Sequence, residues 1–156
     1  MKTKTKPMDA SVIEQVLDEI SKERKAAHAD FTAAAAALTD KLEELNSGVL
    51  PLARTVDECD ADLRAHDRFK ERISTQVFDE GRRVLVANLD AAKVAHKKAM
   101  RDGKEVLAPF EERHKVILEK CRSLASEWDA HQRMARAAGV KVDRFWTPEG
   151  KVLVPA

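Results

Sequence analysis

The stretch LAPFEERHKVILEKCRSLASEWDAHQRMARAA, residues 107–138, decides the fold. Its seam residues, those expected to face another helix, recur at alternating steps of three and four over about four heptads. They are Leu107, Phe110, His114, Ile117, Cys121, Leu124, Trp128, His131, Ala135 and Ala138. A period of 3.5 sustained this long predicts a helix that packs on another helix with left-handed supercoiling. Pro109 lacks a backbone N–H, so the helix should begin near it or kink there, and Gly139 should end it.

A second helix is predicted near the N-terminus. Ser11 and Glu14 have the spacing of a capping box, in which each side chain bonds the free backbone N–H of the other residue. A heptad pattern follows, and Asn46 and Gly48 indicate its end because both residues tolerate the left-handed conformation.

A third helix is predicted between these two. Thr55 and Glu58 repeat the capping-box spacing, and Gly81 indicates a kink or short break because glycine weakens a helix interior. Asp102-Gly103 is interpreted as a second reversal of the chain. The expected helices cover about 11–46, 55–102 and 105–138, within a helical coiled-coil domain over 11–139.

The two ends of the chain differ from its middle. Residues 1–10 are rich in Lys, Thr and Pro without periodicity and are expected to form a flexible basic arm. In residues 140–156, VKVDRFW and KVLVP flank Thr147-Pro148-Glu149-Gly150, which fits a type I turn. This pattern predicts a small β-hairpin tail.

The composition agrees with a mainly α fold. Ala, Glu, Lys, Leu and Arg make up about half of the 156 residues, and aromatic residues only 4%. We expect a long antiparallel helical coiled-coil hairpin, or a three-helix bundle, with a small C-terminal β-hairpin. The 28 basic and 27 acidic residues give a net charge of +1, which removes any global case for a nucleic acid or an anionic membrane as partner.

Cysteine usage and hydropathy indicate the compartment. Cys59 and Cys121 are far apart and belong to no CxxC motif, so neither a disulfide framework nor a zinc site is predicted. The lysines near the N-terminus have no apolar segment behind them, and no aliphatic run is long enough to span a membrane. We therefore expect a soluble, cytoplasmic protein without membrane contact.

The histidines raise the hypothesis of a metal site. Glu111 and His114 have the E-x-x-H spacing of di-iron helical bundles, but Glu127 to His131 is one residue too long to supply the second motif. Seam histidines more often set helix register, and a helical rod offers no cleft for nucleophilic catalysis by a seam cysteine. We therefore predict no metal, no cofactor and no catalytic residue.

Charge is unevenly distributed along the chain. Acidic residues gather at the expected start of the middle helix, and basic residues near Asp102-Gly103 and at the end of the last helix. Helix dipoles favour this arrangement; the alternative is that the cations contact nucleic-acid phosphates. The candidates for that contact are Lys93, Lys97, Lys98, Arg101 and Lys104.

Phe145 and Trp146 form the other candidate site. A short hairpin cannot bury both rings by itself. Either the hairpin folds back on the helices, or the two rings dock a partner or a second copy of the chain.

The segment AAKVAHKKAMRDGKEVLAPFEERHKVILEKCRSLASEWDAHQRMA, followed by FWTPEGKVLVP, resembles bacteriophage-encoded coiled-coil proteins among the recombination-accessory and Gam-like host-nuclease-inhibitor proteins. The resemblance covers about the last 70 residues. It implies a homodimeric phage protein, acting in the host cytoplasm, that binds DNA ends or blocks a host nuclease, with the basic helix tip touching phosphate.

The leading functional hypothesis is a non-enzymatic helical protein for protein–protein interaction, or a structural or accessory protein, that self-associates as a homo-oligomer. The pattern behind it is that the chain has more seam than one antiparallel helix pair needs. The alternative is a Gam-like DNA-binding or nuclease-inhibiting dimer that acts through its basic helix tip.

Overall fold

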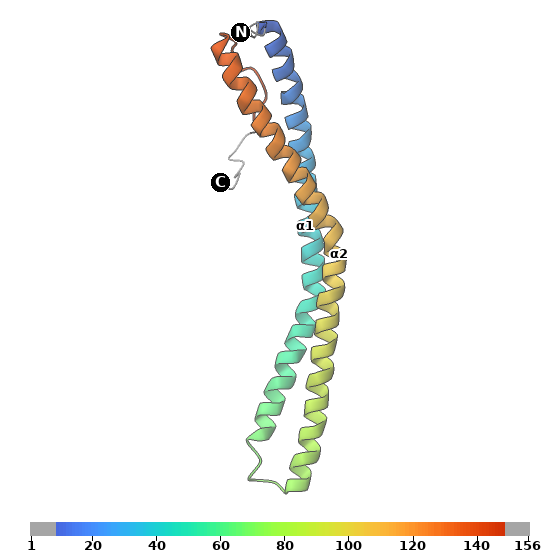
Figure 1. Ribbon diagram of the computed structural model, residues 1–156. Helices are drawn as coiled ribbons and strands as arrows, with labels where there is room; N and C mark the ends of the chain where they lie inside the picture. Colours follow the sequence, from blue (N-terminus) through green and yellow to red (C-terminus); the bar gives the residue numbers. More distant parts are fainter. Residues whose placement is uncertain (1–8, 149–156) are drawn as a thin grey trace, which may run out of the picture. The chain divides into compact units, whose positions relative to one another are not determined.

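Two helices make up most of the structure, a computed structural model that describes residues 9–148. They are α1 (Ala10–Asp67) and α2 (Thr75–Ala137), and residues 68–74 reverse the chain between them (Figure 1). The mainly α class predicted from the composition is confirmed. The structure has two long helices where three were expected. The chain does not reverse at 46–54 or at Asp102-Gly103, because these residues lie inside α1 and α2.

The chain divides into two compact units, each an antiparallel pairing of one part of α1 with one part of α2. Unit 1 combines α1 up to Ala37 with the chain from Glu111 onward. Unit 2 is Leu38–Phe110 and contains the reversal.

Asp9 caps the start of α1. Its side-chain Oδ1 accepts a hydrogen bond from the Ser11 backbone N–H at 3.3 Å, and its carbonyl accepts from Val12 and Ile13 at 3.0 and 3.1 Å. The cap is therefore two residues earlier than the capping box expected from Ser11 and Glu14, since an aspartate oxygen satisfies the free N–H groups equally well.

The seam explains why α1 does not end near Asn46. From Phe31 onward its steps of three and four continue past Pro51, with a single extra step of four, the stutter known from coiled coils, at Lys41–Leu45–Val49. Every seam residue from Phe31 to His66 is buried or half-buried. The helix continues along this stripe in spite of the local stop signals, which together cost roughly 4–5 kcal/mol.

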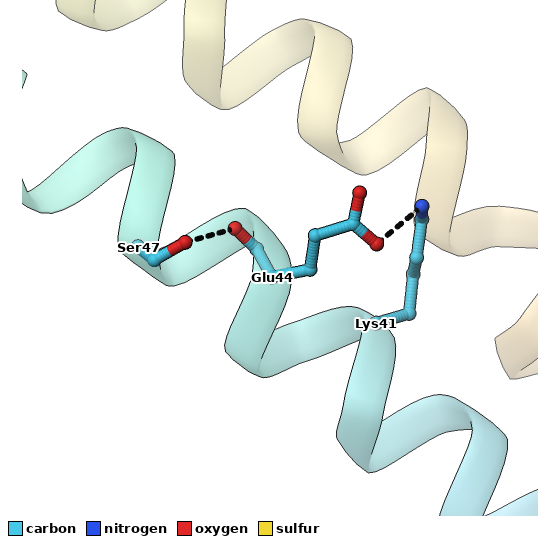
Figure 2. A network of polar contacts seen from close by, with 3 residues as sticks. All are labelled: Lys41, Glu44 and Ser47. Carbon is cyan, nitrogen blue, oxygen red and sulfur yellow. Dashed lines mark hydrogen bonds and ion pairs between the residues drawn. The ribbon is translucent and has the colours of Figure 1, made fainter.

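Pro51 is tolerated because Ser47 and Pro51 are both exposed, so water can bond the carbonyl that lacks a helical donor. Pro51 cannot donate to the Ser47 carbonyl, but Ser47 Oγ donates to the Glu44 carbonyl at 2.7 Å and Thr55 Oγ1 donates to the Pro51 carbonyl at 3.0 Å. Lys41 Nζ donates to Glu44 Oε2 at 2.7 Å, one turn earlier (Figure 2). These side-chain contacts lie along the helix segment that was expected to be a turn.

Gly103 is a buried seam position of α2 and not a reversal. A Cβ added there would lie 3.9 Å from both Cδ atoms of Leu45, so Leu45 packs against it. The α2 seam also has an extra step of four at Ala99–Gly103–Leu107, opposite the stutter of α1, besides one at Gly81–Leu85–Leu89 nearer the reversal. The stutters at Leu45 and Gly103 thus face each other within unit 2.

The actual reversal, residues 68–74, is held by His66 and Asp67. His66 Nε2 donates to the Phe78 carbonyl at 2.9 Å, and the two rings stack with centroids 4.8 Å apart. Gly81 lies beneath this ring, since an added Cβ would come within 2.7 Å of His66 Cε1. The short break predicted at Gly81 is therefore not present, because α2 runs through this residue. The missing side chain of Gly81 leaves room for the His66 ring.

The end of α2 is as predicted. Gly139 has φ 75°, Val140 N–H donates to the Ala135 carbonyl at 2.9 Å and Gly139 N–H to the Arg136 carbonyl at 3.2 Å, which is a Schellman cap. The chain then folds back, and Val140 and Val142 join the core of unit 1. That core also contains Ile13, Leu17, Ile20, Trp128 and Ala135.

The predicted β-hairpin is not found in the described part of its range. Residues 140–148 contain no strand, because their apolar side chains pack on the helices and leave no paired backbone. Residues 149–156, which would supply the second strand, lie outside the described residues, as do residues 1–8 of the expected basic arm.

Candidate functional site

The cations predicted to sit at a helix tip lie in the interior of α2, in unit 2. Lys93, Lys97, Lys98, Arg101 and Lys104 are all exposed, and Lys93 is 18 residues from Thr75 at the nearer end of the helix. Helix dipoles act only within the first and last turn, so they do not account for this cluster.

The acidic cluster also lies away from a helix start. Asp57 and Asp60 belong to the C-terminal part of α1, ten and seven residues before Asp67, whereas the sequence had indicated the beginning of a helix there. Anions gain nothing from the dipole at this position. The segregation of charge between the two helices therefore needs another explanation.

An ion pair marks the side of unit 2 on which both clusters meet. Arg82 Nε lies 3.1 Å from Asp67 Oδ1. Asp67 and Arg82 each directly follow a seam residue, His66 and Gly81. Because the seam faces the other helix along the whole pair, the other residues that directly follow a seam residue lie on the same side. We call this side the lysine face; it comprises Leu42, Leu50, Asp57, Asp60, Arg64 and Asp67 of α1 and Asp79, Arg82, Val86, Asp90, Lys93, Lys97, Met100 and Lys104 of α2.

The lysine face has an acidic half and a basic half. Asp57, Asp60, Asp79 and Asp90 lie toward the reversal, where Arg64 is paired with Asp60 at 2.6 Å. Lys93, Lys97 and Lys104 lie toward the other end of unit 2 and make no ion pair with any residue in 9–148. The structure thus brings three of the five predicted cations to one face.

The other two cations differ. Lys98 lies about 160° from Arg82 around α2, on the far side of the helix. Arg101 is at the edge of the face and lies 3.8 Å from Asp102. On α1, Glu58 is about 180° from Asp67, so it also lies away from the lysine face.

Large apolar side chains are exposed between the charges. Leu50 is 55%, Met100 44% and Leu42 39% exposed. Contacts of Gly81 with His66 and of Gly103 with Leu45 fix the register, in which a residue n of α1 lies beside residue 147 or 148 minus n of α2. Leu50 consequently lies beside Lys97, and the lysine face combines apolar and charged side chains as protein interfaces do.

Phe145 and Trp146, the predicted docking residues, pack on unit 1. The Phe145 ring meets the Trp128 ring edge to face at 5.8 Å, and Trp146 meets His28 at 5.6 Å. Both are half-buried. Of the two arrangements expected for these rings, folding back on the helices is the one seen in the described residues.

Ser21 anchors this segment and was missed by the sequence analysis. Its Oγ accepts a hydrogen bond from the Trp146 backbone N–H at 3.0 Å and lies 3.5 Å from the Trp146 carbonyl. Ser21 is 5% exposed. The signal in the sequence is weak: a serine directly follows the seam residue Ile20. A hydroxyl buried beside the seam needs a hydrogen-bond partner, which the Trp146 backbone supplies.

Arg24 and Arg144 complete the aromatic cluster of unit 1. The Arg24 guanidinium lies 5.0 Å from the Trp128 ring centre, and Arg144 lies 5.0 Å from that of Phe145 and 2.9 Å from Glu14. Burial lowers the pKa of Arg24, and nearby Asp129 acts in the opposite direction. These contacts describe a packed end of unit 1 with cations over aromatic faces.

Three polar seam residues, His114, His131 and Cys121, have structural partners. His114 packs against Phe31 with ring centres 5.0 Å apart, and His131 Nδ1 lies 2.8 Å from the Glu127 carbonyl. Cys121 Sγ donates to the Ala27 carbonyl at 3.4 Å, and burial raises the pKa of its thiol. Within residues 9–148, no group of three or more His, Cys, Asp or Glu is placed to hold a metal ion.

Comparison with protein families, with curated proteins and with solved structures finds no match to this chain. Neither helix contains a segment long and apolar enough to cross a membrane.

Proposed function

We propose that the chain is a non-enzymatic helical protein that acts by binding other proteins through the sides of its helix pair, and that it self-associates. The observation that carries the proposal is the incomplete core of unit 2. In α1 from Leu38 to Asp67 no residue is buried, and in α2 up to Phe110 only Phe78, Leu89 and Gly103 are.

The apolar side chains of unit 2 support it further. A pair of helices covers only the seam between them, and large apolar side chains outside the seam remain exposed. Those of unit 2 that are 39–67% exposed are Leu42, Leu50, Val77, Val84, Val94, Met100 and Val106. Bundles of four helices bury such positions between neighbouring pairs. A further pair of helices, from the same or another protein, that packs on the lysine face would cover Leu42, Leu50 and Met100 of this set.

The experiment is a measurement of molar mass in solution. Light scattering or sedimentation at tens of micromolar should give a mass above the 17.4 kDa of one chain, increasing with concentration. A strict monomer under these conditions would contradict self-association.

We further propose a cytoplasmic setting. Cys59 and Cys121 are both free, which fits a compartment that keeps thiols reduced. Fractionation of the native host tests it, since recovery of the protein outside the cytoplasm would contradict it.

A second candidate is the phage Gam-like dimer that binds DNA or inhibits a host nuclease. The observation in its favour is the exposed row Lys93, Lys97 and Lys104, which lies on one side of α2. It predicts DNA binding that weakens steeply with salt and is lost when Lys93, Lys97, Lys98 and Lys104 are all replaced by Glu. No shift in a low-salt gel assay, with duplex ends or single strands, would refute it.

A further inference from the structure

We propose that the lysine face is a two-fold interface in which a second copy of this chain packs antiparallel on unit 2. The proposal rests on the self-association proposed above and names its surface. In such an interface each half of the face meets the other half of the partner's face, so a self-complementary surface is required.

The positions of the charges along the helices meet this requirement. Taking Val56 as the point on the two-fold axis, the helical rise of 1.5 Å per residue puts Lys93, Lys97 and Lys104 about 2, 8 and 19 Å away on one side. Asp57, Asp60 and Asp79 lie about 2, 6 and 19 Å away on the other side. A rotation of 180° about the axis therefore brings each lysine to the height of an aspartate of the second copy. Lys104 faces Asp79 on the same helix of that copy, and Lys93 and Lys97 lie diagonally across from Asp57 and Asp60 on its other helix.

The apolar residues of the face follow the same symmetry. Leu50 is about 9 Å from the axis on the basic side, and Val86 about 8 Å on the acidic side. Leu50 is 55% exposed and Val86 half-buried, so both can gain contact area. A second copy thus offers both charge pairing and apolar contact.

The acidic half favours a second copy over a nucleic acid. Asp57, Asp60 and Asp90 lie on the same side of unit 2 as Lys93 and Lys97. A phosphate backbone laid along this face would meet these carboxylates and be repelled by them. A protein surface that carries both signs in the opposite order is the better match.

The test uses charge reversal in the full chain. One variant carries Lys93→Glu and Lys97→Glu, and the other Asp57→Lys and Asp60→Lys. The matched controls are Lys98→Glu and Glu58→Lys, which make the same changes one residue away but on the far side of each helix. Sedimentation equilibrium in nucleic-acid-free buffer gives the dissociation constant, and circular dichroism checks that each variant is helical.

Each double reversal should raise the dimer dissociation constant by about tenfold or more, because like charges then face each other. The controls should stay within about twofold of the unchanged protein, since they leave the interface intact. An equimolar mixture of the two double variants should form a heterodimer as tightly as the unchanged protein does, because every opposed pair is again of opposite sign.

Three results would overturn the inference. They are a double variant that dimerises like the unchanged protein, a control that weakens the dimer as strongly as the double variants, and a mixture that stays monomeric although both variants are helical. If the unchanged chain self-associates in these cases, only the interface is wrong. If the unchanged chain is monomeric, the proposed self-association fails with it, and a gel shift lost in the lysine variant would then assign the face to nucleic acid.

Discussion

Three glycines of the two helices should respond in different ways to replacement by alanine. Alanine is favoured over glycine in a helix interior by about 0.8–1.0 kcal/mol. At Gly48 an added Cβ meets nothing within 4 Å, and at Gly103 it meets the two Cδ atoms of Leu45 at 3.9 Å, which is ordinary contact. Gly48→Ala and Gly103→Ala should therefore each stabilise the protein by about 0.5–1 kcal/mol.

Gly81→Ala should behave in the opposite way. The new methyl group would lie 2.7 Å from His66 Cε1 and 3.1 Å from Nε2, so the ring has to move. Its movement breaks the hydrogen bond to the Phe78 carbonyl, worth about 0.5–1.5 kcal/mol, and the ring stacking, worth about as much. After subtracting the gain in helix propensity, we expect a loss of up to about 2 kcal/mol.

The assay is urea unfolding followed by circular dichroism, at one fixed protein concentration because association changes apparent stability. A double-mutant cycle isolates the cause: in a His66→Ala background, Gly81→Ala should become stabilising by about 1 kcal/mol. If Gly81→Ala stabilises the protein as much as Gly48→Ala does while His66 is present, the proposed contact between His66 and Gly81 is refuted.

Other contacts lead to further predictions. Ser21→Ala removes the partner of the Trp146 N–H and should lower the free energy of unfolding by about 1–3 kcal/mol, measured by urea unfolding, whereas the exposed Ser47→Ala should cost much less. The same Ser21 substitution should increase Trp146 exposure, and unchanged acrylamide quenching of the tryptophan fluorescence would contradict this. Burial raises the pKa of Cys121, so its thiolate population at pH 8 is smaller in the folded than in the unfolded chain, and iodoacetamide should alkylate it more slowly in buffer than in urea. Equal rates after correction for the effect of urea on a model thiol would contradict the partial burial of Cys121.

The heptad pattern of residues 107–138 predicted the second half of α2 correctly, because a stripe of period 3.5 is a direct consequence of helix packing. The Schellman cap at Gly139 was predictable for a similar reason, since few residues other than glycine adopt φ 75° without strain. Both signals are local: the spacing of apolar residues shows the heptad pattern, and a glycine directly after it shows the cap.

The chain reversal was not predictable in the same way. Residues 68–74, RFKERIS, contain neither Gly nor Pro, and their charges suit an exposed helix. Ser74 was the available signal, since its carbonyl accepts from Phe78 N–H at 2.9 Å and its Oγ lies 3.4 Å from Val77 N. Conversely, a helix end was indicated by Asn46, Gly48 and Pro51. Only the continuation of the seam before and after these residues shows that helix packing outweighs these local signals.

The candidate sites were predicted in part. The lysines are clearly visible in the sequence, but their relation to Asp57 and Asp60 is set by the place of the reversal, which decides which residues of α1 lie beside which of α2. Once that register is known, the lysines of α2 and the aspartates of α1 are seen to share one face of unit 2, which the linear order of the residues does not show.

The hydrogen bond between Ser21 and Trp146 joins residues 125 positions apart, whereas His66 and Phe78 are only 12 apart. Closing a longer loop costs more chain entropy, so contacts near the reversal should form first and those of unit 1 last. During synthesis, all residues of unit 2 are present once Phe110 has been added, whereas unit 1 also requires the residues from Glu111 onward. We therefore expect hydrogen-exchange labelling during refolding to show early protection of amides in unit 2, and the self-association proposed for unit 2 would not depend on completion of unit 1.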